Sequence, residues 1–141
     1  MRYLLCADGS QVSKNALDLL GKVFTKGRDE LVILTVGGYE EHFWEDSATR
    51  ENHQQKVAAH AQSIVDEYVK LAIEKGFDNV SGTIATGNVR DLIVQYASSN
   101  EIDMIAMGAT GMGLGAVAKL LVGSVSDYVM KHTTLPILLA K

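Results

Sequence analysis

The chain has 141 residues, of which 47% are hydrophobic and 21% are charged, a composition typical of a globular protein rather than a disordered one. Its formal net charge is −4 and its lysines and arginines form no run, which argues against a nucleic-acid partner. No apolar stretch approaches a membrane span, and residues 1–10 turn polar too early for a signal peptide. The single cysteine cannot form an internal disulfide. We therefore expect one domain, residues 1–141, in the cytoplasm with no membrane partner.

The chain opens with two short apolar runs separated by an amphipathic segment. Residues 2–7 and 31–36 are almost wholly apolar, which favours strands buried on both faces. Between them, residues 11–26 show helical spacing, and Ser10 or Ser13 is suited to cap that helix. Its expected apolar face consists of Val12, Ala16, Leu19, Leu20 and Val23.

The middle of the chain alternates in the same way. Residues 48–75 form the longest helical pattern, and residues 79–86 follow as a strand. Asn88 is a good cap for the next helix, and residues 102–107 predict a fourth strand. This half of the chain therefore repeats the helix and strand order of the first.

The C-terminal part completes the pattern. Ser124 is expected to cap a short helix that runs to Met130, with Val125 and Val129 facing inward. Residues 135–140 predict a fifth strand, whose proline at position 136 suits the edge of a sheet. Five strands alternating with four helices predict an α/β fold, a doubly wound parallel sheet with helices on both faces. If the strand order is 3-2-1-4-5, the binding crevice lies between the first and fourth strands and brings residues 8–10 opposite residues 108–115.

A segment of a different kind follows the second strand. Residues 37–47 contain two glycines, four carboxylates, a histidine and three aromatic side chains. Two interpretations stay open: a loop whose aromatic side chains pack on the protein body, or a flap over a ligand or partner.

A loop with four glycines follows the fourth strand, at positions 108, 111, 113 and 115. Glycine allows backbone N–H groups to approach an anion closely, and a helix N-terminus adds unpaired donors, so the pattern predicts a phosphate site. The loop has no Gly-Lys-Ser or Gly-Lys-Thr, which excludes a P-loop. It satisfies G-x-G-x-x-A over residues 111–116, but only about 25 residues follow, too few for a dinucleotide-binding fold.

The chain resembles the universal stress protein family over its whole length. The similarity rests on residues 108–111, on Gly123-Ser124, on the closing strand around Pro136 and on residues 4–17. ATP-binding members of that family carry G-x-x-G, nine residues and then G-[S/T]. Here residues 112–122 separate Gly111 from the next part of the pattern, so the loop is two residues longer.

The resemblance implies a role for each matching residue. Asp8 would meet the ribose or the adenine side of the nucleotide, and the backbone of Val36 would bond the adenine edge. Gly108 and Gly111 would approach the phosphates, while Gly123 and Ser124 would donate N–H and hydroxyl groups to them. The full set of expected binding residues is Ala7, Asp8, Gly9, Ser10, Val36, Met107, Gly108, Thr110, Gly111, Gly113, Gly123, Ser124 and Val125.

These implications predict an adenine-nucleotide-binding protein of the stress-response or signalling type that takes ATP with a divalent cation such as Mg²⁺. No arginine or obvious general base lies in the glycine loop, so we expect at most slow hydrolysis and assign no catalytic residue. Two alternatives stay open: a nucleotide-free scaffold that acts through dimerisation, and an enzyme acting on another small phosphorylated molecule. Residues 135–140, as an exposed edge strand, predict a homodimer, which the resembled family also commonly forms.

Overall fold

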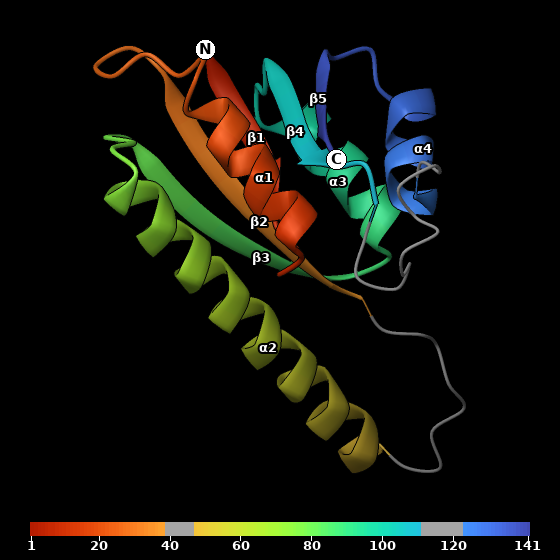
Figure 1. The fold of residues 1–141 in the computed structure, drawn as a ribbon. Helices are drawn as coiled ribbons and strands as arrows, with labels where there is room; N and C mark the ends of the chain where they lie inside the picture. The colour runs from red at the N-terminus through yellow and green to blue at the C-terminus, as the bar shows by residue number, and fades with distance from the viewer. Residues whose placement is uncertain (39–46, 111–122) are drawn as a thin grey trace.

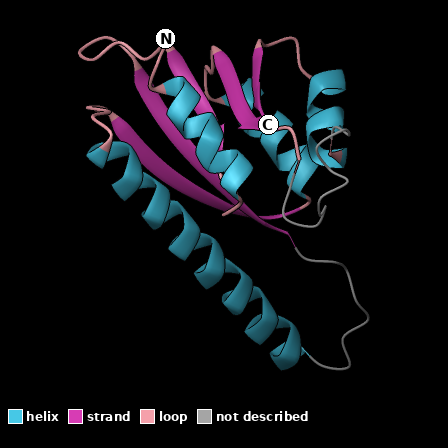
Figure 2. Ribbon diagram, in the orientation of Figure 1, coloured by secondary structure: helices cyan, strands magenta, loops and turns pink. Residues whose placement is uncertain are grey.

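The computed structural model describes residues 1–38, 47–110 and 123–141, and the predicted alternation of strands and helices is confirmed there (Figures 1 and 2). The elements are β1 (Arg2–Cys6), α1 (Gln11–Leu20), β2 (Glu30–Gly38), α2 (Ser47–Glu74), β3 (Val80–Gly87), α3 (Val89–Ser99), β4 (Met104–Gly108), α4 (Ser124–His132) and β5 (Ile137–Ala140). Most of the aromatic segment predicted at 37–47, and the glycines at 111, 113 and 115, lie outside the described residues. In that segment, Gly37 and Gly38 belong to β2, and Ser47 begins α2.

The five strands form one parallel sheet in the order β3-β2-β1-β4-β5, as the sequence predicts. The direction of winding reverses between β1 and β4, the two neighbours whose registers align Leu5 with Ala106. In such sheets, ligands bind beyond the carboxyl ends of the strands at this reversal. The fold therefore places the predicted crevice between the ends of β1 and β4.

Helices cover both faces of the sheet, α1 and α2 on one side and α3 and α4 on the other (Figure 1). Successive side chains of a strand point to opposite faces, so Leu5 packs with the α1 and α2 cluster while Leu4 packs with the α3 and α4 cluster. Both side chains are fully buried. This double burial explains why β1, β2 and β4 are almost continuously apolar.

Helix α1 is shorter than the sequence indicates, because it ends at Leu20 rather than at residue 26. The N–H groups of residues 22 and 23 bond to carbonyls three residues back, which tightens the chain into a turn. This turn brings the ring of Phe24 to 4.7 Å from that of Phe77, measured between centroids. Val23, expected on the buried face, is 48% exposed. Aromatic packing after Leu20 has overridden the helical periodicity.

The last two elements also differ in detail from the prediction. Ser124 is the first residue of α4, and Gly123 occupies the capping position without a side-chain hydrogen bond. Strand β5 begins at Ile137, and the carbonyl of Pro136 just before it accepts from the Ile105 N–H. The edge position of β5 in the sheet is confirmed. Among the described residues, none of the helices combines the length and apolarity needed to cross a membrane.

Candidate functional site

The β1–α1 turn presents a carboxylate at the end of β1. Gly9 has φ +86°, a conformation that suits glycine, and Ser10 caps α1 by accepting from the Ser13 N–H at 3.1 Å. The Asp8 carboxylate is exposed, and its Oδ1 accepts from the Ser10 N–H at 2.9 Å and from the Ser10 hydroxyl at 2.5 Å. Among the described residues, none is seen to donate a hydrogen bond to the second carboxylate oxygen, Oδ2. The turn thus orients one carboxylate oxygen and leaves the other available to a ligand hydroxyl.

The end of β2 offers a backbone edge to the same crevice. The Leu31 N–H bonds to the carbonyl of Asn79, next to β3, whereas the Leu34 carbonyl accepts from the Ala7 N–H, next to β1. Backbone groups of a strand alternate between its two neighbours, so Val36 also directs its N–H and C=O toward the β1 side. The β1–β2 pairing ends at Leu34, while β2 continues past it. Val36 therefore presents one donor and one acceptor beyond the end of β1.

Gly108, at the end of β4, lies directly against the start of α1. A Cβ at this position would lie 2.8 Å from Val12 Cγ1, 3.1 Å from the Thr110 carbonyl oxygen and 3.2 Å from the Ser13 nitrogen. Two of these three neighbours are backbone atoms, which cannot move aside easily. Close packing of β4 on α1 therefore requires glycine here, whether or not a phosphate approaches.

The carbonyl of Ala109 joins the end of β4 to the start of α4. It accepts from the Gly123 N–H at 2.6 Å and from the Ser126 hydroxyl at 2.7 Å. The Ser126 hydroxyl also lies 3.0 Å from the Gly123 carbonyl oxygen, and the Ala109 N–H bonds to Ala140 of β5. Ser126 is 2% exposed and was not predicted as a site residue. Nothing in its sequence context marks it, because its partner is seventeen residues away.

This arrangement brings the N-termini of two helices to residues 108–110. Helix α1 starts against Gly108, and α4 starts at the residue bonded to Ala109. The first N–H groups of a helix lack intrahelical acceptors and carry a positive partial charge. The Gly123 N–H, expected to face a phosphate, instead donates to the Ala109 carbonyl. The donors that α4 can offer to an anion are therefore the N–H groups of residues 124–126. Two helix ends thus make the crevice attractive to an anion.

The structure brings together most of the expected binding residues and leaves two undescribed. Ala7, Asp8, Gly9 and Ser10 follow β1, Met107 and Gly108 end β4, and Gly123, Ser124 and Val125 start α4. Val36 lies on the neighbouring strand, and Thr110 follows β4 directly. Gly111 and Gly113 lie outside the described residues, so their roles stay predictions.

Cys6, two residues before Asp8, packs its thiol into the protein interior rather than into the crevice. Its thiol is packed against the α3 and α4 cluster, and burial, with a smaller contribution from the Asp8 charge, raises its pKa to about 12. A thiol with this pKa carries almost no thiolate near neutral pH, so Cys6 has a structural role.

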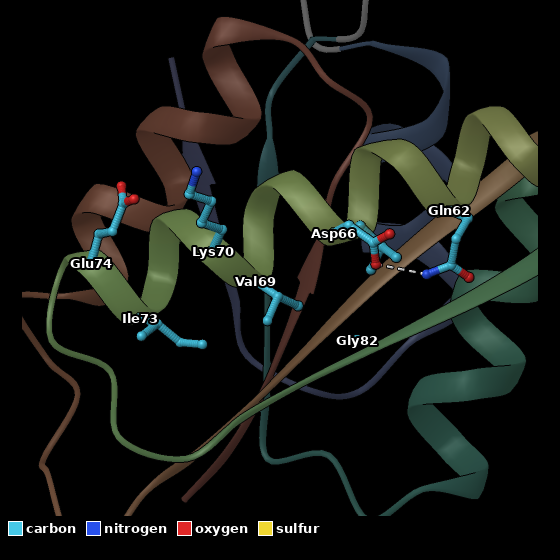
Figure 3. Close-up of a pocket in the computed structure, with 8 residues that line it drawn as sticks. Gln62, Asp66, Val69, Lys70, Ile73, Glu74 and Gly82 are labelled. Carbon is cyan, nitrogen blue, oxygen red and sulfur yellow. Dashed lines mark hydrogen bonds between the residues drawn. The ribbon is translucent and has the colours of Figure 1, made fainter.

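A cavity of about 450 Å³ lies elsewhere, between α2 and β3 (Figure 3). Val69, Ile73 and Gly82 form part of its lining, and Gln62 bonds to Asp66 at its side. It opens on the α2 face of the sheet rather than at the carboxyl ends of β1 and β4, and it is therefore separate from the candidate site. No group of three metal-binding side chains occurs within residues 1–38, 47–110 and 123–141.

Comparison with known proteins decides the family. The profile of the universal stress protein family matches residues 1–141. The chain belongs to this family. A universal stress protein of Bacillus subtilis is 25% identical over 154 residues, and the match covers 99% of this chain and 98% of the relative's length. A putative universal stress protein of Staphylococcus haemolyticus is 24% identical over 146 residues, covering 98% and 82%.

Solved structures of this family share the fold. The hypothetical protein MJ0577 superposes with a TM-score of 0.81 at 26% identity, covering 99% of this chain and 94% of its own. The universal stress protein UspA from Lactobacillus plantarum gives 0.84 at 22% identity, covering 100% and 97%. Two more distant structures contain nucleotides. One is a universal stress protein in complex with cAMP, with a TM-score of 0.71. The other is an Arabidopsis thaliana family protein with AMP bound, with a TM-score of 0.70.

Proposed function

We propose that this universal stress protein binds an adenine nucleotide, with ATP as the ligand, in the crevice between β1 and β4, and that it acts in a stress response or in signalling. The observation that carries the proposal is the convergence of the α1 and α4 N-termini on residues 108–110, beside the backbone of Val36, which lies past the end of the β1–β2 pairing. Family members with the same fold that contain AMP and cAMP support the choice of an adenine nucleotide.

The phosphates would lie at the α4 side of the crevice. Residues 123–125 contain no basic side chain, so an anion there would be held by backbone N–H groups, the helix dipole and the exposed Ser124 hydroxyl. Thr110 supplies a second hydroxyl next to Gly108. A carboxylate would repel phosphate, so the Asp8 end of the crevice suits the ribose, whose hydroxyls can donate to Oδ2, the oxygen that no other described residue is seen to bond.

The adenine would lie against the end of β2. The Val36 N–H and C=O are spaced as one donor and one acceptor on a strand edge, which matches the acceptor and donor of an adenine edge. Guanine reverses this pattern at its six-position, so we expect GTP to bind more weakly.

A divalent cation such as Mg²⁺ would reach the site on the nucleotide, coordinated mainly by the phosphates. Hydrolysis would be slow at most, because residues 108–110 and 123–125 contain neither a general base nor an arginine.

A pair of substitutions at Ser124 tests the phosphate half of the site. Proline is tolerated at the first position of a helix, and the preceding Gly123, with φ −66° and ψ 159°, already has a compatible conformation. Ser124→Pro therefore removes one N–H donor while α4 is retained. Ser124→Ala is the matched control that removes only the hydroxyl.

The readout is calorimetric titration with ATP and Mg²⁺. Loss of a hydrogen bond to a charged group predicts about ten-fold weaker binding by Ser124→Pro. Adenosine, which has no phosphates, should bind both variants equally. Equal ATP affinity for wild type and Ser124→Pro would contradict phosphate binding at α4.

A second candidate function, a nucleotide-free dimeric scaffold, is favoured by one observation. The glycine at 108 and the N–H of Gly123, both expected to serve phosphate, are accounted for by contacts with Val12, Ser13 and Ala109. In this case β5, an edge strand, would pair with a second copy of the chain through residues 135–140. A scaffold would show a dimer by light scattering and no heat on titration with millimolar ATP. A nucleotide-binding protein would show binding.

A further inference from the structure

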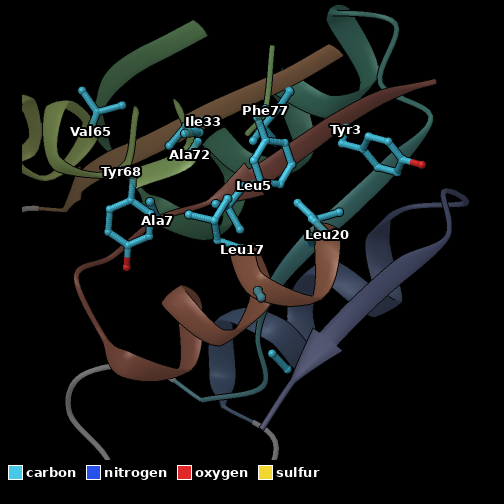
Figure 4. Packing of buried hydrophobic residues seen from close by; sticks show 14 residues of the cluster. Tyr3, Leu5, Ala7, Leu17, Leu20, Ile33, Val65, Tyr68, Ala72 and Phe77 are labelled. Carbon is cyan, nitrogen blue, oxygen red and sulfur yellow. The ribbon is translucent and has the colours of Figure 1, made fainter. Parts of the chain in front are cut away.

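A buried tyrosine on α2 is hydrogen-bonded to the β1–α1 turn. Tyr68 is fully buried in the cluster formed with α1 and α2, and its hydroxyl points out of that cluster toward the turn (Figure 4). The hydroxyl is hydrogen-bonded to the Ser13 hydroxyl and donates to the Ser10 carbonyl oxygen at 3.3 Å. Its partners thus belong to the start of α1, fifty-five and fifty-eight residues away.

Ser10 continues this connection to the exposed end of the turn. Its hydroxyl accepts from the Ser13 N–H and donates to Asp8 Oδ1, and its own N–H bonds to the same carboxylate oxygen. Tyr68 is therefore hydrogen-bonded to Ser13 and Ser10, the Ser13 N–H bonds to the Ser10 hydroxyl, and Ser10 bonds to Asp8. We call this series the Tyr68–Asp8 chain.

Helix α2 supports both parts of the crevice that face an adenosine. Ile64 lies 3.7 Å from the position of a Cβ on Gly9, within the turn that carries Asp8. Val57 packs so closely on Gly37, next to Val36, that a Cβ there would lie 2.6 Å from its Cγ1. The Tyr68–Asp8 chain is the polar part of this support.

The ring of Tyr68 and its hydroxyl have separable roles. The ring fills space among apolar side chains, which a phenylalanine ring would fill equally. Burial raises the pKa of Tyr68, so the hydroxyl stays protonated and remains a donor at neutral pH. A buried hydroxyl is retained without a free-energy penalty only when it is bonded, and here each bond fixes the β1–α1 turn.

We propose that Tyr68 is a positioning residue whose hydroxyl, through Ser13 and Ser10, holds the Asp8 carboxylate in the orientation that accepts from a ribose hydroxyl. The inference rests on the proposed nucleotide site and adds to it a residue outside the crevice. A positioning residue would change the affinity only for nucleotides that carry the ribose hydroxyl bound by Asp8, whereas a purely structural core residue would change the affinity for every nucleotide alike.

The test compares ATP with its 2′-deoxy and 3′-deoxy analogues for wild type and Tyr68→Phe, by calorimetric titration. Wild type should prefer ATP to the analogue that lacks the hydroxyl bound by Asp8. Tyr68→Phe should bind ATP about five-fold more weakly, as expected for one misplaced hydrogen bond, and should bind that analogue with unchanged affinity. The measured quantity is thus the ratio of the affinities for ATP and the deoxy analogue, which a purely structural role of Tyr68 would leave unchanged.

Three further variants control the experiment. Tyr3→Phe removes a hydroxyl from the same apolar cluster, where its partner is the Met1 sulfur, and should leave the discrimination unchanged. Ser13→Ala removes the bonds of the Ser13 hydroxyl to Tyr68 and to the Ser10 carbonyl without touching the ring, and should reproduce part of the effect even if Tyr68→Phe folds poorly. In an Asp8→Asn background, Tyr68→Phe should weaken ATP binding no further.

The outcomes separate the two proposals. If wild type binds ATP and both Tyr68→Phe and Ser13→Ala keep the wild-type ribose discrimination, the positioning role is refuted while the nucleotide site stands. An equal loss of affinity for all three nucleotides also refutes it, since that result describes a structural residue. If wild type binds none of the nucleotides, the proposed function fails and this inference fails with it.

Discussion

Helices α1 and α4 begin at the same edge of the sheet but are fixed there by different means. At α1, Ser10 caps the helix with its own hydroxyl, whose hydrogen bonds fall within residues 8–13, and the distant Tyr68 adds to this local cap. At α4, the capping residue Gly123 contributes no side chain, and the helix start is held by the Ala109 carbonyl. A helix start built from neighbouring residues can be recognised in a sequence, whereas one built from distant contacts cannot.

The largest effect is expected where the end of β4 packs on α1. Gly108→Ala places a methyl group 2.8 Å from Val12 Cγ1 and against two backbone atoms. We expect a loss of about 2–3 kcal/mol of unfolding free energy, since overpacking forces the backbone to shift. Urea unfolding of Gly108→Ala and wild type measures this loss. A loss below about 0.5 kcal/mol would show that β4 and α1 are not in close contact.

The local cap of α1 should give the next effect. Ser10→Ala removes the acceptor for the Ser13 N–H and one donor to Asp8, and we expect a loss of about 1–2 kcal/mol. Ser10→Thr, which retains a hydroxyl able to accept from the Ser13 N–H and donate to Asp8, should recover part of the unfolding free energy. A neutral Ser10→Ala would mean that α1 is held by packing alone.

The distant contact at α4 should matter somewhat less. Ser126→Ala removes a buried hydroxyl from the Ala109 carbonyl, which still accepts from the Gly123 N–H. We expect a loss of about 1 kcal/mol in the same unfolding measurement. A Ser126→Ala variant as stable as wild type would contradict the importance of this contact for the α4 start.

The smallest effect belongs to the residue that the sequence marks as the cap of α4. Ser124 is exposed and lies one position inside the helix, so Ser124→Ala should change the unfolding free energy by less than about 0.3 kcal/mol. A loss near 1 kcal/mol, similar to that of Ser10→Ala, would restore Ser124 as a cap and remove the contrast between the two helices.

The sequence predicted the fold well because burial patterns are local. The apolar runs at 2–7 and 31–36 favoured buried strands, and their alternation with helices indicated a parallel sheet with few possible strand orders. The errors arose where distant contacts decide. Helix α1 ends early because Phe24 packs on Phe77 instead of continuing the helix. Gly123, whose N–H donates to the Ala109 carbonyl, takes the capping position of α4 in place of Ser124.

The fold places the elements that carry the expected site residues, whereas the contacts among these residues were not predictable. Asp8, Val36 and Gly108 were expected at the crevice, and the fold brings their elements together. That Gly108 is required by α1 and that Tyr68 reaches the β1–α1 turn depend on packing across the sheet face. No spacing in the sequence relates these residues to one another.

The most direct test of the nucleotide site is the thermal unfolding of the purified wild-type chain against increasing ATP with Mg²⁺. A ligand that binds only the folded state stabilises it by about 2.7 kcal/mol at a hundred-fold excess over its dissociation constant. We predict a saturable rise in Tm that follows this dependence and is smaller with GTP. An unchanged Tm at millimolar ATP would contradict the account.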